Sequence, residues 1–205
     1  EGGEGKVAAQ YLTALYQLAK AAVEKEDYAE AKELLLRAVG EYPHNLGEGK
    51  LESGQENNLY YLLGLVQEKL GEAKDAFESL TRACCGESEP VGMMYYNDQP
   101  PEMIYYQGLA YRMLGEEEQA VRRFQKLVDY GREHIRDDVK IDYFAVSLPD
   151  LLIFEENLNE RNRKHCLFMM SLGLKGLGRI DEAEKCAEEL LAMDNAHQEI
   201  RVHDL

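Results

Sequence analysis

Helix-forming segments alternate with short polar turns along this chain, and one pattern of apolar and small residues returns in each turn. The segment LGEEEQA at 114–120 recurs as LGEAKDA at 70–76 and LGRIDEA at 177–183, with a weaker copy, EKEDYAEA, at 24–31. Each copy follows an apolar segment of helical character and opens another. Aligning the copies places an alanine at one shared position: Ala31, Ala76, Ala120 and Ala183. The pattern predicts four helix pairs.

A second small residue stands twelve positions before each alanine: Ala19, Gly64, Gly108 and Ser171. A glycine inside a helix costs about 1 kcal/mol relative to alanine, so helix propensity does not explain Gly64 and Gly108. Two antiparallel helices approach closely where their crossing is lined by small side chains. We therefore expect a packing notch at this position, and we expect the first helices to end in left-handed glycines at Gly71, Gly115 and Gly178.

The arrangement resembles the tetratricopeptide-repeat family, whose unit is a pair of antiparallel helices of about 34 residues. The four repeats fall at about 12–45, 57–90, 101–133 and 164–197. The departures from the family pattern include Gln67 in place of an aromatic residue and Gln107 in place of an apolar one, and the proline expected at the end of each repeat is missing from repeats two to four. The resemblance implies an all-α fold: a right-handed superhelical array of antiparallel helix pairs, which is a TPR-like α-solenoid with long inter-repeat insertions, in a single domain over 1–205.

The insertions between repeats are longer than those of the family. One carries Met93, Met94, Tyr95 and Tyr96 in a row, and we expect it to pack onto the array because an exposed loop seldom holds four such residues. The region of about 134–160 is rich in apolar residues and predicts a helical insertion, in which Pro149 opens a helix. The residues from Asn195 to Leu205 predict a short capping helix.

The resemblance also implies a concave groove lined by the first helix of each repeat. One groove position carries an aromatic ring in all four repeats, the next carries aliphatic residues in three, and a third carries two basic residues: Tyr16, Tyr61, Tyr105 and Phe168; Leu65, Leu109 and Leu172; Arg112 and Lys175. Aromatic side chains in a groove are good anchors for a peptide or helix. Two other interpretations stay open: the rings are covered by the chain's own tail or insertion, or they form a contact between copies, as in a homodimer.

Other candidate chemistry is weak. The carboxylate clamp of some family members is absent, since the positions that would form it include Asn58, Glu102, Tyr106 and His165. A basic cluster of Arg161, Arg163 and Lys164 is expected to be solvated or paired with carboxylates. The histidines His197 and His203, six positions apart, do not have a metal-binding spacing. We find no nucleophile beside a base and no glycine-rich phosphate loop, so we expect neither a cofactor nor an enzymatic activity.

Composition narrows the class of partner. The formal net charge is −16, which opposes binding to a phosphate backbone and argues against nucleic acid. No run of apolar residues is long enough for a membrane span. The four cysteines are Cys84, Cys85, Cys166 and Cys186, and they form neither a CxxC pair nor a zinc spacing. We expect buried or half-buried free thiols in a reducing compartment, which is the cytoplasm.

A narrower resemblance concerns the stretches YYNDQPPEMIYYQGLA, KIDYFAVSLPDLLIFEENLNERNR and LLAMDNAHQEI. They resemble the C-terminal repeat region of large bacterial proteins that have an uncharacterised β-rich N-terminal domain. The opening residues, EGGEGKVAAQ, show no signal pattern and are expected to be the edge of a longer protein. The function expected from the sequence is a protein–protein interaction scaffold that binds a peptide or helix in its groove. The alternative is an architectural module that packs on its parent enzyme domain or self-associates.

Overall fold

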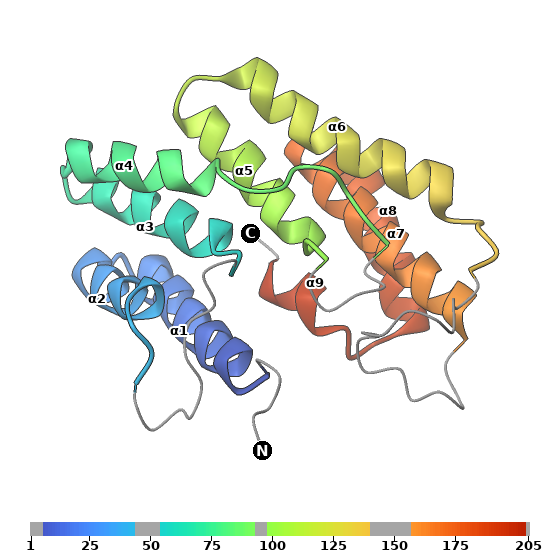
Figure 1. Ribbon diagram of the computed structural model, residues 1–205, viewed down its shortest axis with the longest axis horizontal. Coiled ribbons are helices and arrows are strands. Elements are labelled where there is room, and N and C mark those ends of the chain that lie inside the picture. The colour runs from blue at the N-terminus through green and yellow to red at the C-terminus, as the bar shows by residue number, and fades with distance from the viewer. Residues whose placement is uncertain (1–5, 44–53, 93–97, 140–156, 204–205) are drawn as a thin grey trace. The chain divides into compact units, whose positions relative to one another are not determined.

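The computed structural model describes residues 6–43, 54–92, 98–139 and 157–203. These residues contain nine α-helices and no β-strand (Figure 1). The chain divides into two compact units, which we call unit 1 (residues 1–86 and 110–115) and unit 2 (residues 87–109 and 116–205). The expected helical insertion around Pro149 and the segment Met93–Tyr96 lie outside the described residues.

Unit 1 is built from consecutive helices that pack against their neighbours in the chain. They are α1 (Lys6–Glu24), α2 (Tyr28–Val39), α3 (Asn57–Lys69) and α4 (Ala73–Ala83). Helix α2 buries Ala31, Leu35 and Ala38, which share one helical face. The side chain of Asp27 caps the start of α2 by accepting a hydrogen bond from the Glu30 amide at 3.1 Å.

Unit 2 contains the first part of α5 (Pro101–Met113), followed by α6 (Glu117–His134), α7 (Leu158–Gly176), α8 (Ile180–Met193) and α9 (Gln198–Val202). Helix α7 packs against both α6 and α8. Asn157 caps the start of α7, because its side chain accepts hydrogen bonds from the amides of Asn159 and Glu160.

The small residues inside the first helices are packing notches, as expected. A Cβ on Gly64 would lie 2.6 Å from the Cγ of Leu80, and a Cβ on Gly108 would lie 2.4 Å from Cε1 of Phe124. The ring of Phe124 is fully buried and also lies against Gly176 of α7. A Cβ on Gly176 would lie 2.2 Å from Cδ1 of that ring. A larger residue at these crossings would therefore force a side chain of the neighbouring helix to move.

The expected left-handed glycines also end the first helices. Gly71, Gly115 and Gly178 have φ values of 79°, 83° and 74°. In the first repeat the same conformation is taken by Glu26, at φ 59°, which the sequence did not reveal. The amide of Asp27 bonds to the Ala22 carbonyl at 2.9 Å, so the turn keeps its hydrogen bond without a glycine.

The two glutamines that depart from the family pattern make buried hydrogen bonds. Gln67 accepts a bond of 2.7 Å from the Ser79 hydroxyl and joins α3 to α4. Gln107 is fully buried, and its amide nitrogen donates to the Glu87 carbonyl at 2.8 Å while its oxygen accepts from Arg123 at 3.1 Å. Each departure replaces an apolar contact by a satisfied polar one.

The all-α class and the antiparallel helix pairs are confirmed by these helices and their packing (Figure 1). Residues 195–203 contain a helix, α9, as the sequence predicted. None of the described helices has both the length and the apolar character needed to cross a membrane.

Candidate functional site

In unit 1 the predicted groove residues differ in exposure. Tyr16 is buried, and the ammonium of Lys20 lies 5.9 Å from the centre of its ring. Tyr61 and Leu65, one turn apart on α3, are half-buried, and Arg112 is exposed. The surface that these last three residues leave open combines a ring, an aliphatic side chain and a guanidinium.

Tyr61 is anchored on one side by the core of unit 1. Its ring packs on a cluster formed by Leu80, Ala83 and Ala110. Burial raises the pKa of the Tyr61 hydroxyl, and the charge of Arg112 lowers it by a smaller amount. The ring is therefore held in place and keeps a partly exposed surface close to a positive charge.

In unit 2 the predicted rings are covered by the chain itself. Tyr105 is buried, with its ring 5.6 Å from that of Tyr106 and 5.7 Å from that of Phe124. Phe168 is also buried, and the ring of His197 lies 5.5 Å from it. Leu172 is buried, whereas Leu109 and Lys175 are half-buried. Ligand binding by any of the nine residues stays a prediction.

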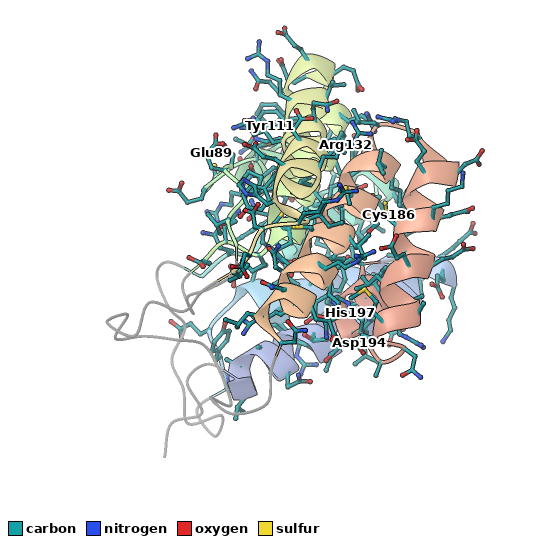
Figure 2. All side chains as sticks on the ribbon, turned by 90° about the vertical axis from the view of Figure 1, so that its right-hand side faces the viewer. Glu89, Tyr111, Arg132, Cys186, Asp194 and His197 are labelled. Carbon is teal, nitrogen blue, oxygen red and sulfur yellow. The ribbon has the colours of Figure 1, made fainter. Side chains whose placement is uncertain are left out.

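The segment that contains α9, residues 194–203, covers part of α5 and α7. Val202 and His203 are its buried residues. The hydroxyl of Tyr106 lies 3.0 Å from Nδ1 of His203, and Nε2 of His203 lies 3.8 Å from a carboxylate oxygen of Glu102. Figure 2 shows Asp194 and His197, at the start of this segment, close together beside the end of α8.

Burial shifts the pKa values of two titratable groups near this segment, Glu102 and His165, in opposite directions. It raises the pKa of Glu102 to about 7, and the nearby Glu199 adds to this shift. It lowers the pKa of His165 to about 4, against a hydrogen bond of 2.8 Å from its Nε2 to the Val91 carbonyl. A cavity of about 410 Å³ is lined by both groups and by Phe168, His197, Lys164 and Asp194, among others.

Sequence reasoning does not identify this cluster. In the repeat pattern Glu102 and His165 stand only at clamp positions that lack the clamp residues, and His197 and His203 attract attention only as metal ligands. A usable signal is present, because Glu102 and His165 occupy the same groove position in successive repeats. No group of three or more metal-ligating side chains lies within the part of the chain that is described.

The structure also shows the surroundings of the basic cluster and of the cysteines. Arg163 pairs with Glu189 at 2.5 Å, and Lys164 lies 3.6 Å from Asp194, so the expected pairing with carboxylates is confirmed for both. None of the four cysteines forms a disulfide. The expectation of burial is wrong for Cys85, which is exposed because it follows the end of α4.

Comparisons with known proteins support the repeat assignment. A sequence profile described as "Tetratricopeptide repeat" matches residues 16–90, and a second profile with the same description matches residues 102–130. Two solved structures, titled "Crystal structure of MamA" and "Crystal structure of MamA protein", are similar at 19% identity and TM-scores of 0.33 and 0.32. They cover 90% and 95% of this chain and 79% and 77% of their own, and neither likeness is strong enough to bear on the fold or the function. On the profile matches and the four series of repeat positions, the chain belongs to the tetratricopeptide-repeat family.

Proposed function

We propose that this chain is a protein-interaction scaffold that binds a peptide or helix on the open surface formed by Tyr61, Leu65 and Arg112 in unit 1. Tetratricopeptide repeats support an interaction role in general, because stacked helix pairs present an extended surface. The observation that carries the proposal is the half-buried ring of Tyr61, packed on a core cluster beneath it. A ring held in this way contributes contact area at low entropic cost.

The chemistry of this surface indicates the ligand. Tyr61 and Leu65 suit an apolar side chain, and the positive charge of Arg112 close to Tyr61 favours an acidic residue on the same ligand. Lys20, over the ring of Tyr16, adds a positive charge to unit 1 in a chain whose net charge is −16. The ligand that fits is a short amphipathic segment with an acidic residue beside its apolar anchor.

A second candidate function has its own support. In unit 2 the segment 194–203 already covers α5 and α7, which favours an architectural role for that half. Such a role suits a module that packs within a larger bacterial protein, on a parent enzyme domain, or on a second copy. Four cysteines without a disulfide suit a reducing compartment, and we place the protein in the cytoplasm.

Peptide selection tests the first function even while the natural partner is unidentified. Displayed random 12-residue peptides are selected on the full chain, and the selected peptides are titrated by fluorescence anisotropy. We expect Tyr61→Ala to weaken binding by at least about tenfold, as for an interface anchor. The matched control is Phe77→Ala, which removes an aromatic ring that is 62% exposed on α4. Selected peptides that bind both variants equally well would contradict the proposed surface.

A further inference from the structure

The segment 194–203 is attached to unit 2 through two imidazole rings. His203 is buried at one end of α9, against Tyr106 and Glu102 of α5. His197 precedes α9, and its ring lies 5.5 Å from that of Phe168 on α7 at an angle of 51°. The two histidines, whose spacing does not suit a metal, therefore share another role, which is to hold one helical turn against two helices.

Two buried side chains, Tyr106 and Glu102, contact the imidazole of His203. The Tyr106 hydroxyl lies 3.0 Å from Nδ1, and a Glu102 carboxylate oxygen lies 3.8 Å from Nε2. The ring of Tyr106 meets the imidazole edge to face, with centroids 5.5 Å apart and an angle of 68°. Tyr106 is fully buried and Glu102 nearly so, and the imidazole therefore has one buried hydroxyl at hydrogen-bond distance and one buried carboxylate slightly farther away.

His197 packs against Phe168 and also caps the start of α9. Its Nδ1 accepts a hydrogen bond from the Ile200 amide at 3.4 Å, which satisfies one of the free amides at the start of α9. The same nitrogen lies 3.6 Å from a carboxylate oxygen of Glu199. The spacing of six residues between the histidines thus matches one capped turn that spans from α7 to α5.

We propose that this face of α5 and α7 is a second binding surface, specific for a one-turn helix with two imidazole side chains six positions apart, and that residues 194–203 are its in-chain occupant. The partner is a protein segment of that chemistry, which competes with the in-chain segment. The inference goes beyond the proposed function, since it concerns unit 2 and does not depend on ligand binding by Tyr61.

The attachment of the in-chain segment is suited to exchange. Helix α9 has five residues, and a helix this short is not stable alone, so its order depends on its contacts. Within 194–203, Val202 and His203 are the buried residues. Because the segment is tethered, it competes at a high effective concentration, and a partner binds weakly unless the in-chain contacts are reduced.

A labelled copy of the segment tests the proposal. The probe is a fluorescein-labelled peptide of residues 194–203, DNAHQEIRVH, and the receptor is the full chain carrying His203→Ala, whose own segment lacks one anchor. We expect saturable binding by anisotropy, weakened at least about tenfold when the peptide itself carries His203→Ala, since the contacts of the imidazole with Tyr106 and Glu102 are then lost. The matched control peptide carries Gln198→Ala, at an exposed position, and should bind like the parent.

Two further measurements make the outcome decisive. Adding Tyr106→Phe to the receptor removes the hydroxyl that faces Nδ1 and should weaken the parent peptide but not the peptide that lacks the imidazole. If the His203→Ala chain does not fold, the receptor is the chain carrying His197→Ala, whose own segment lacks its other anchor; excess parent peptide should then increase hydrogen exchange of its residues 198–203, because it displaces them. Absence of binding together with unchanged exchange, or equal binding of the peptides with and without the imidazole, would overturn the proposal. Neither measurement involves Tyr61, so a negative result here would not bear on the proposed peptide binding in unit 1.

Discussion

Glu102 and His165 line one cavity, and their titration should change the stability of the chain in opposite directions. The pKa of Glu102 rises from its ordinary value of 4.5 to about 7 because the carboxylate is buried and faces Glu199. The pKa of His165 falls from 6.5 to about 4, also through burial, with Arg161 and His197 adding to the shift and Asp98 opposing it. The two pH windows overlap between about pH 4.5 and 6.5.

The sign of each effect follows from proton binding. Between pH 4.5 and about 7 the folded chain holds a proton on Glu102 that the unfolded chain has lost, so the free energy of unfolding falls as pH rises. Between about 4 and 6.5 the unfolded chain protonates His165 and the folded chain does not, so the free energy of unfolding rises with pH. The change from 4.5 to about 7 in the pKa of Glu102, and that from 6.5 to about 4 in the pKa of His165, each correspond to about 3 kcal/mol.

The variants Glu102→Gln and His165→Gln separate the two effects. Glutamine keeps the size of each side chain, and at 165 its amide can still donate to the Val91 carbonyl. Urea unfolding is followed by circular dichroism from pH 4 to pH 8, and subtracting the wild-type free energy from that of the variant removes the contribution of other groups. For Glu102→Gln, the free energy of unfolding of the variant minus that of the wild type should increase by about 3 kcal/mol as pH rises from 4.5 to 7. For His165→Gln, the same difference should decrease by about 3 kcal/mol as pH rises from 4 to 6.5.

A control variant tests the assigned cause. Glu199→Gln removes a negative charge that helps to raise the pKa of Glu102, so in that background the Glu102 transition should move to lower pH. The reasoning is refuted if the differences for Glu102→Gln and His165→Gln do not change with pH, since both groups would then titrate in the folded chain as they do in water.

Three changes test the helix packing. Gly108→Ala should lower the free energy of unfolding by about 1–2 kcal/mol in a urea titration, because overpacking against Phe124 exceeds the helix-propensity gain of about 1 kcal/mol. This loss of stability should be smaller in the Phe124→Leu background. If the two substitutions had additive effects, the contact between Gly108 and Phe124 would be contradicted. Glu26→Gly should stabilise the chain by up to about 1 kcal/mol in thermal unfolding, because Glu26 has a left-handed backbone, and any loss would argue against that conformation. Gly115→Ala should cost about 1–2 kcal/mol for the same reason, measured in the same way, although a Cβ there meets no other atom; an unchanged melting temperature would disagree.

The parts of the structure that the sequence predicted depend on local rules. The spacing between Gly64 and Ala76, or between Gly108 and Ala120, is set by one helix pair, so a single repeat contains the information. The helix ends at Gly71 and Gly178 are predictable for the same reason, since glycine favours the left-handed conformation. The left-handed conformation of Glu26 was not predicted, because its turn has the same backbone geometry without the expected glycine.

The cluster under α9 could not be predicted in this way. Tyr106 and His203 are 97 positions apart, and no periodicity connects them. The repeat pattern assigned Tyr105 and Phe168 to a groove because it describes one repeat and says nothing of what covers it. In the structure Tyr105 contacts Phe124 and Phe168 contacts His197, so both rings are buried by the chain itself.

The central claim is that the open surface at Tyr61, Leu65 and Arg112 receives a peptide. Hydrogen–deuterium exchange of the full wild-type chain, with and without a selected peptide, tests it most directly. The account predicts that the peptide protects the amides of α3 around Tyr61 and Leu65 and leaves those of α4 around Phe77 unchanged. Protection confined to α4, with none on α3, would contradict it.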